Sequence, residues 1–171
     1  FIYLFEDLVK WIWGGKIRSI PPPELFAGSL KLLGNTVPSY SLFDHFAFRV
    51  DGDTVTLMGK VSGPTLKRDA ESVVKRIEGV KKVENKIEVL PLSPNDDKLR
   101  LGLYRAIYGH GALQTLAVRA VPPIHIIVDK GDVTLEGVVG NEMQKHIARI
   151  QADAVHGVFS VRNNLRVEGK S

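Results

Sequence analysis

An internal repeat constrains the fold of this chain more than any other feature of its sequence. Adding 78 to a position between 55 and 89 gives the identical residue at many places, without a gap. So many matches at one offset predict two tandem copies of one small domain. The matching residues are Val55-Thr56-Leu57 with Val133-Thr134-Leu135, Gly59 with Gly137, Val61 with Val139, Lys67 with Lys145, Ala70 with Ala148, Gly79-Val80 with Gly157-Val158, Val83 with Val161, Asn85 with Asn163, and Val89 with Val167.

The composition is that of a folded protein, because 44% of the 171 residues are hydrophobic and 25% are charged. These fractions exclude a disordered chain, a collagen-like repeat and a protein with several membrane spans. The absence of cysteine excludes disulfides, cysteine-ligated zinc, iron–sulfur clusters and thiol nucleophiles. The net charge of +4 allows a weak attraction to anionic surfaces, but the basic residues are spread along the chain and form no concentrated stripe.

The hydrophobic periodicity of the first copy predicts a β-hairpin, a helix and a third strand. Apolar residues alternate over 46–50 and 55–61, on either side of a tight-turn sequence at 51–53, which indicates a hairpin. Pro64 suits the first turn of a helix and Gly79 suits its end. The helix then carries one apolar stripe, and alternation resumes in the last strand. The stripe is Leu66, Ala70, Val73, Val74 and Ile77, and the strand contains Val83, Ile87 and Val89.

The second copy repeats this order, with a hairpin over 124–139, a helix that Asn141 caps and Gly157 ends, and a last strand over 161–167. The clearest apolar stripe of this helix is one residue out of phase with the first copy. Either the helix is rotated slightly or it buries a wider face. The stripe that we expect to be buried comprises Met143, Ile147, Ile150 and Ala154.

Each hairpin is predicted to follow another helix, over 96–108 in the second copy and over 24–33, more weakly, in the first. Each copy is therefore α-β-β-α-β. The predicted fold class is α/β (an α+β sandwich) with two tandem domains, 21–92 and 93–171. Each domain is expected to form a three-stranded mixed sheet covered on one face by two helices.

Residues 1–20 form a separate apolar and aromatic segment. Its first 13 residues are too short and too charged for a spanning helix, which needs roughly 20 apolar residues. Three interpretations stay open: a helix packed on the domains, an interfacial membrane helix, or the end of an export or anchor segment.

These motifs carry a family resemblance. The hairpin Val-Thr-Leu-x-Gly-x-Val, the helix that ends in Gly-Val, and the closing Val-x-Asn-x-Ile/Leu-x-Val occur twice in the same order. With them the chain resembles the BON domain (bacterial osmotically induced and nodulation) over about residues 22–169. The resemblance implies a small α/β sandwich in the periplasm or cell envelope, a link to stress response, binding of anionic phospholipid, and no catalytic activity. It also implies an alternative, a periplasmic protein-interaction or chaperone-like domain pair.

Six of the repeated residues are expected to be structural. A glycine within a strand usually marks a bulge or a close approach, and an asparagine at the entrance of a strand usually bonds local backbone. These residues are Gly59, Gly79, Asn85, Gly137, Gly157 and Asn163.

No motif for catalysis or for a cofactor is present. The five histidines form no metal-binding pair, and the aspartates of the two turns lack the further acidic ligands of a calcium loop. Nucleophile-elbow and phosphate-binding glycine motifs are missing. We therefore expect no enzyme, no metal site and no cofactor. The clamp of KH domains and paired exposed aromatics are missing too, which argues against nucleic acid as a partner.

Two groups of residues are candidates for binding, with an anionic phospholipid surface or envelope proteins as the expected partners. Lipid binding needs an apolar patch bordered by cations. The candidates for it are Trp11, Trp13, Lys16, Arg18, Lys145 and Arg149. Protein interaction is indicated instead by an aromatic helix end before the long connection 112–123, with Tyr104, Tyr108 and His110. A third interpretation has these tyrosines packing between the two domains. The sequence predicts no oligomeric state.

Overall fold

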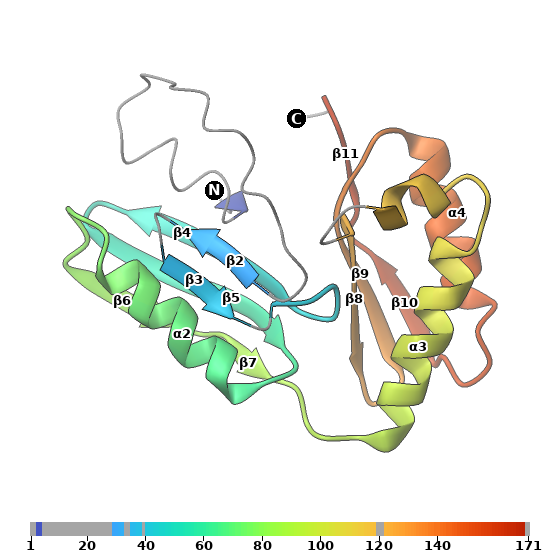
Figure 1. The fold of residues 1–171 in the computed structure, drawn as a ribbon, viewed down its shortest axis with the longest axis horizontal. Coiled ribbons are helices and arrows are strands. Elements are labelled where there is room, and N and C mark those ends of the chain that lie inside the picture. Colours follow the sequence, from blue (N-terminus) through green and yellow to red (C-terminus); the bar gives the residue numbers. More distant parts are fainter. Residues whose placement is uncertain (1–2, 5–28, 33–34, 39, 119–121, 170–171) are drawn as a thin grey trace. The chain divides into compact units, whose positions relative to one another are not determined.

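The computed structural model describes residues 3–4, 29–32, 35–38, 40–118 and 122–169 (Figure 1). The chain divides into two units with separate cores. Unit 1 consists of Phe1–Tyr40 and His45–Leu90, and unit 2 of Ser41–Asp44 and Pro91–Ser171. The short stretch Ser41–Asp44 therefore belongs to unit 2, although the residues on both sides of it belong to unit 1.

Unit 1 is built on a hairpin and a crossover helix. Strand β4 pairs antiparallel with β5, and helix α2 then returns the chain so that β6 and β7 run parallel to β5. A βαβ crossover needs a helix of this kind because parallel strands cannot be joined by a tight turn. The bounds are β4 His45–Asp51, β5 Thr54–Val61, α2 Pro64–Lys75, β6 Lys82–Asn85 and β7 Glu88–Val89.

The first helix expected in unit 1, over 24–33, is wrong where the structure describes it. Strand β2 (Ser29–Leu32) pairs antiparallel with β3 (Asn35–Pro38). Leu30 and Leu32 alternate with polar residues, and Val37 is β-branched. These features favour a hairpin over a helix that would contain both Gly28 and Ser29.

Strand β1 (Tyr3–Leu4) adds to the outer edge of β4, with Tyr3 opposite Phe48 and Leu4 opposite Ala47. These two residues are therefore extended, and not part of a helix as one interpretation of the N-terminal segment has it. Trp11, Trp13, Lys16 and Arg18 lie outside the described residues.

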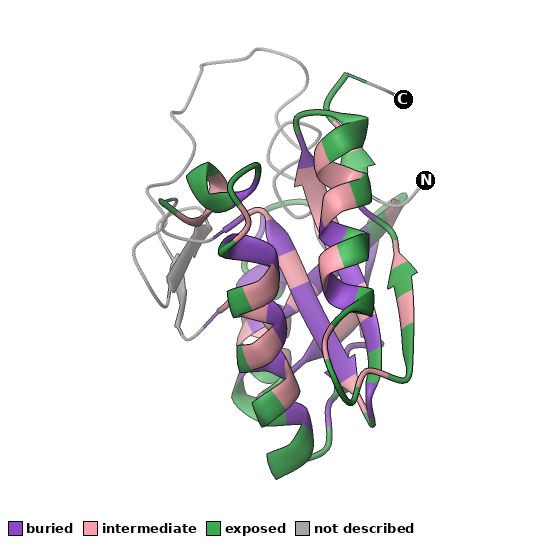
Figure 2. Ribbon diagram, turned by 90° about the vertical axis from the view of Figure 1, so that its right-hand side faces the viewer, coloured by how far each residue is buried: buried purple, intermediate pink, exposed green. Residues whose placement is uncertain are grey.

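Unit 2 has the complete predicted order and confirms the expected fold class. Helix α3 precedes the β8–β9 hairpin, and α4 leads to β10 and β11, which run parallel to β9. Figure 2 shows α3 and α4 lying over one face of this mixed sheet. The bounds are α3 Pro94–Tyr108, a 3-10 helix Gln114–Val118, β8 Ile124–Asp129, β9 Asp132–Val139, α4 Glu142–Asp153, β10 Ser160–Asn163 and β11 Arg166–Val167.

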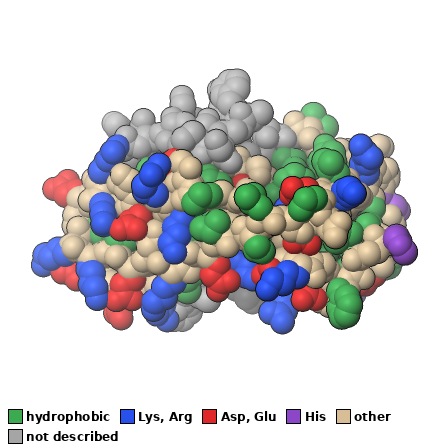
Figure 3. Space-filling view, turned by 90° about the horizontal axis from the view of Figure 1, so that it is seen from below, with side chains coloured by type: hydrophobic (Ala, Val, Ile, Leu, Met, Phe, Trp, Pro, Cys, Tyr) green, Lys and Arg blue, Asp and Glu red, His purple; other side chains and the backbone are tan. Residues whose placement is uncertain are grey.

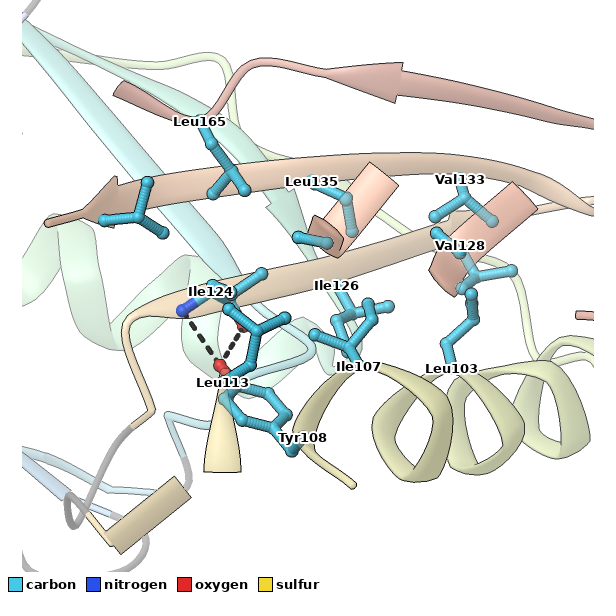
Figure 4. Close-up of a cluster of buried hydrophobic side chains, with 13 residues drawn as sticks. Leu103, Ile107, Tyr108, Leu113, Ile124, Ile126, Val128, Val133, Leu135 and Leu165 are labelled. Atoms are coloured by element: carbon cyan, nitrogen blue, oxygen red, sulfur yellow. Dashed lines mark hydrogen bonds between the residues drawn. The ribbon is translucent and has the colours of Figure 1, made fainter. Parts of the chain in front are cut away.

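The core of unit 2 lies between this sheet and its two helices (Figure 4). Alternate residues of β8 and β9 point into it, as expected for a sheet with one covered face. The hydroxyl of Tyr108 enters the same core, accepts a hydrogen bond from the Ile124 N–H (2.9 Å) and donates one to the Ile124 C=O (2.8 Å). The buried members are Leu103, Ile107, Tyr108, Leu113, Ile124, Ile126, Val128, Val133, Leu135, Val139, Ala148, Ala152 and Leu165.

Helix α4 does not bury the stripe expected from the sequence. Met143 is 68% exposed and Ile150 is 61% exposed, whereas Ala148 and Ala152 are fully buried. The buried alanines stand 78 positions after Ala70 and Val74, which are both buried on α2. The two helices therefore have the same phase. The expected stripe followed the larger apolar side chains, whereas the residues that α4 buries are two alanines, whose small side chains allow the helix to pack closely.

An asparagine fixes the end of the crossover in each unit. The Asn163 Nδ2 donates to the C=O of Lys145 on α4 (2.9 Å), and its Oδ1 accepts from the Leu165 N–H (3.2 Å). The Asn85 side chain bonds the C=O of Lys67 (2.8 Å) and the Ile87 N–H (3.2 Å) in the same way. Each asparagine stands where the last strand is interrupted, so one side chain joins the helix to both strand segments.

A glycine is required in the second strand of each hairpin, where it lies close to the backbone at the start of the first strand. Gly137 has φ +119°, and a Cβ built on it would lie 2.0 Å from the C=O oxygen of Pro123. Gly59 has φ +124° and would meet the C=O of His45 at 2.1 Å. Both the backbone conformation and the space exclude a side chain.

We therefore expect Gly137→Ala to lower the free energy of unfolding by about 2–4 kcal/mol, because the backbone must shift and leave a strained conformation. Gly111→Ala is the matched control, since its Cβ would meet nothing within 4 Å and its φ is not positive. Urea unfolding followed by circular dichroism measures both. Equal stability of the two variants would contradict the geometry.

The phase of α4 gives a second prediction. Ala148→Asp buries an unpaired carboxylate and should cost more than about 3 kcal/mol. Ile150→Asp places the same group in solvent and should change stability by less than about 0.5 kcal/mol. The thermal midpoints of the two variants distinguish the observed phase from the stripe expected from the sequence, which predicts the reverse order.

Candidate interaction surface on helix α4

The outer side of α4 carries exposed apolar residues that the fold does not need. Met143 and Ile150 are seven residues apart and so lie on one side of the helix, with the exposed Ala154 one turn further on. We call these three residues the α4 apolar face. In α2 the positions 78 residues earlier are Thr65, Ser72 and Arg76. The same domain therefore folds with polar residues there.

The predicted basic residues lie on another side of α4, about 100° to 160° around the helix from Met143 and Ile150. Lys145 and Arg149 lie one helical turn apart, Lys145 partly buried and Arg149 exposed. The Arg149 Nε lies 3.4 Å from an oxygen of Asp153. The two side chains are 58% and 50% exposed. A pair so exposed contributes little to stability and leaves the guanidinium open to other anions. In α2 the residue equivalent to Arg149 is Glu71, which bonds Lys75 at 2.6 Å.

The charge around α4 is mixed. Glu142 lies in its first turn and Asp153 in its last, so acidic groups stand between Arg149 and the α4 apolar face. On the face that Figure 3 presents, basic and acidic side chains are likewise interspersed. This arrangement does not resemble a dense basic stripe.

The aromatic residues predicted for protein interaction are placed differently. Tyr108 is buried in the core of unit 2, and burial raises the pKa of its hydroxyl. The ring of Tyr104 lies 5.3 Å from that of Tyr108 and is partly buried. The Nδ1 of His110 accepts a hydrogen bond from the Ala112 N–H (3.3 Å). Tyr108 is therefore a structural residue of its own domain.

His125 is partly buried. It stands on β8 beside Ser41 and Asp44, and desolvation lowers its pKa, so that it is neutral at pH 7. Within the described ranges, no three histidine, aspartate or glutamate side chains lie close enough together to hold a metal ion. Among the helices of the same ranges, none is long and apolar enough to cross a membrane.

Sequence reasoning missed the α4 apolar face because it assigned Met143 and Ile150 to the core. The signal that finds them is the repeat itself. Aligning the copies puts Ala148 and Ala152 on the buried positions of α2 and leaves Met143 and Ile150 on positions that are polar in the first copy.

Comparison with known proteins agrees with the repeat. The chain is similar to Osmotically-inducible protein Y of Escherichia coli (strain K12), with 33% identity over 122 residues, which are 70% of this chain and 60% of that protein. It thus spans about three fifths of the length of this relative.

Two solved structures of CdsD, a structural protein of the type III secretion system of Chlamydia trachomatis, are more distant. One is 15% identical with a TM-score of 0.27 and covers 72% of this chain and 84% of the other. The other, a C-terminal domain, is 13% identical with a TM-score of 0.28 and covers 73% and 90%. These TM-scores are too low to support an inference.

The family comparison matches both copies. The BON domain covers residues 38–91 and again residues 111–169, which include both hairpins, both crossover helices and both asparagines. The resemblance noted from the motifs is confirmed, and this chain belongs to the BON domain family.

Proposed function

We propose that this protein is a non-catalytic module of the bacterial envelope, linked to osmotic stress, that binds anionic phospholipid surfaces through helix α4. Membership of the BON family and the relative named Osmotically-inducible protein Y support the envelope and stress setting. The observation that carries the choice of α4 is the exposure of Met143 and Ile150 on a helix that also bears Lys145 and Arg149.

The chemistry of this surface suits the boundary between lipid headgroups and acyl chains. Met143 and Ile150 would enter the apolar layer, while Arg149 and, further around α4, Lys145 extend long basic side chains that attract the headgroup phosphates. Each basic residue close to an anionic membrane contributes about 1 kcal/mol, within a Debye length. Two such residues and two apolar side chains give weak, reversible binding that fades as salt rises.

Binding is measured by co-sedimentation of the protein with vesicles of phosphatidylglycerol and phosphatidylcholine. Replacing Met143→Thr and Ile150→Ser gives α4 the residues of α2 and should weaken binding roughly tenfold, because about 1.5 kcal/mol of apolar transfer is lost. Lys145→Gln with Arg149→Gln should weaken it by about thirtyfold and flatten the salt dependence. Both pairs of changes are exposed or half-exposed and should leave the thermal midpoint nearly unchanged.

Matched controls distinguish binding through the outer side of α4 from nonspecific binding to vesicles. Leu92→Ser with Val118→Thr removes two apolar residues that are 96% and 86% exposed elsewhere in the same unit. Lys67→Gln with Arg68→Gln removes the same charge from α2. Controls that weaken binding as much as the α4 variants would contradict the assignment to α4. An intact protein that ignores anionic vesicles at low salt but suppresses aggregation of an unfolded client would favour the protein-interaction alternative.

A further inference from the structure

The outer edge of strand β8 is covered in three places by three different groups. Asp129 and Asp132 flank the two-residue turn, so Ile124, Ile126 and Val128 direct their N–H and C=O groups away from β9. The Tyr108 hydroxyl satisfies both groups of Ile124, and the Arg100 Nη2 donates to the Val128 C=O (2.8 Å). Both side chains belong to α3.

The middle of this edge is covered by backbone instead. The Ile126 N–H donates to the C=O of Leu42 (2.7 Å), which belongs to the short stretch Ser41–Asp44. That stretch is a turn closed within itself. The N–H and Oγ of Ser41 both donate to Asp44 Oδ2, at 2.9 and 2.7 Å, and the Asp44 N–H donates to the Ser41 C=O at 3.1 Å. We call Ser41–Asp44 the edge turn.

The equivalent place in unit 1 holds a strand. Phe48 stands 78 positions before Ile126, and the residue opposite Phe48 is Tyr3 of β1. By the same register argument, Phe48 directs its N–H and C=O outward, so Tyr3 is the residue that faces them. In both copies this position is thus filled by residues of the same unit that lie outside the repeated stretches 55–89 and 133–167, with a leucine next to an aromatic residue: Tyr3-Leu4 in one and Leu42-Phe43 in the other.

We propose that the middle of the β8 edge is a docking site for an extended apolar segment of another polypeptide, which pairs with Ile126 as Tyr3–Leu4 pairs with Phe48. Strand addition to a sheet edge is a general mode of peptide recognition, in which main-chain hydrogen bonds supply the affinity. The edge turn occupies the site in cis. A docking segment must displace this turn, whose Asp44 is buried and whose Leu42 and Phe43 pack against the core of unit 2, while the bonds within the turn hold its shape.

The test uses the full chain and a fluorescein-labelled peptide with the sequence of residues 1–8, with binding read by fluorescence anisotropy. Ser41→Ala with Asp44→Ala removes the bonds that close the edge turn. Because three hydrogen bonds to these two side chains are lost, the docked turn becomes less populated and the peptide should bind about tenfold more tightly than to the parent. Ser160→Ala with Asp132→Ala removes a similar hydroxyl–carboxylate pair from β9 and β10 and should not change binding.

Two peptide variants test the register. Methylation of the Tyr3 nitrogen in the peptide removes a group that faces the edge and should abolish binding, whereas methylation of the Leu4 nitrogen should leave it nearly unchanged. In the protein, the amide resonance of Ile126 should shift on binding and exchange more slowly. Shifts at Phe48 in place of Ile126 would show exchange of β1 in unit 1 and would overturn the assignment.

The proposal also fails if the edge-turn variant binds the peptide no better than the parent, or if the two methylated peptides bind alike. Should Ser41→Ala with Asp44→Ala reduce the thermal midpoint sharply, Ser41→Ala alone serves as the milder variant. Amide exchange of Ile126 in the parent, with and without excess peptide, gives the same answer without any substitution.

Discussion

The bond from one asparagine to its crossover helix is the interaction on which each domain depends. Asn163 joins α4 to β10 and β11, and Asn85 joins α2 to β6 and β7, through nearly the same distances. The last strand must run parallel to the central one, and its interruption would otherwise leave backbone groups unpaired near the core. A single amide satisfies both the helix carbonyl and the strand N–H. This explains why the asparagine falls within the repeat, together with the glycine that ends the preceding turn.

The two copies share their interior and differ on their surfaces. Buried positions of α2 recur on α4, whereas the outer positions change from Thr65 and Ser72 to Met143 and Ile150, and from Glu71 to Arg149. A fold that tolerates both sets places little constraint on that surface. The apolar and basic residues of α4 are therefore those that we propose for binding, and α2 provides an internal reference for them.

The edge of a sheet is the second surface of this protein for which we propose binding. An exposed edge presents unpaired N–H and C=O groups, and proteins commonly cover it. Here α3 covers both ends of the β8 edge with side chains, and the edge turn covers its middle. In unit 1 the same middle position is taken by β1. The edge and the outer side of α4 are different surfaces, so lipid and peptide binding can be tested independently.

The sequence by itself determined the tandem architecture, the hairpins, the crossover helices and the family, because repeated glycines and asparagines and alternating apolar residues are local signals. The prediction was wrong where the helical pattern was weak, because the expected helix over 24–33 includes strand β2. The periodicity of α4 taken alone was misleading about which side is buried, although alignment with α2 would have indicated it. Helical periodicity shows which positions are apolar, but it does not show whether the sheet or solvent lies opposite them. The sheet packs against Ala148 and Ala152, whose small side chains allow close packing. The edge turn was beyond sequence reasoning, because its partner Ile126 is 84 residues away and the pairing depends on where the folded edge of β8 lies.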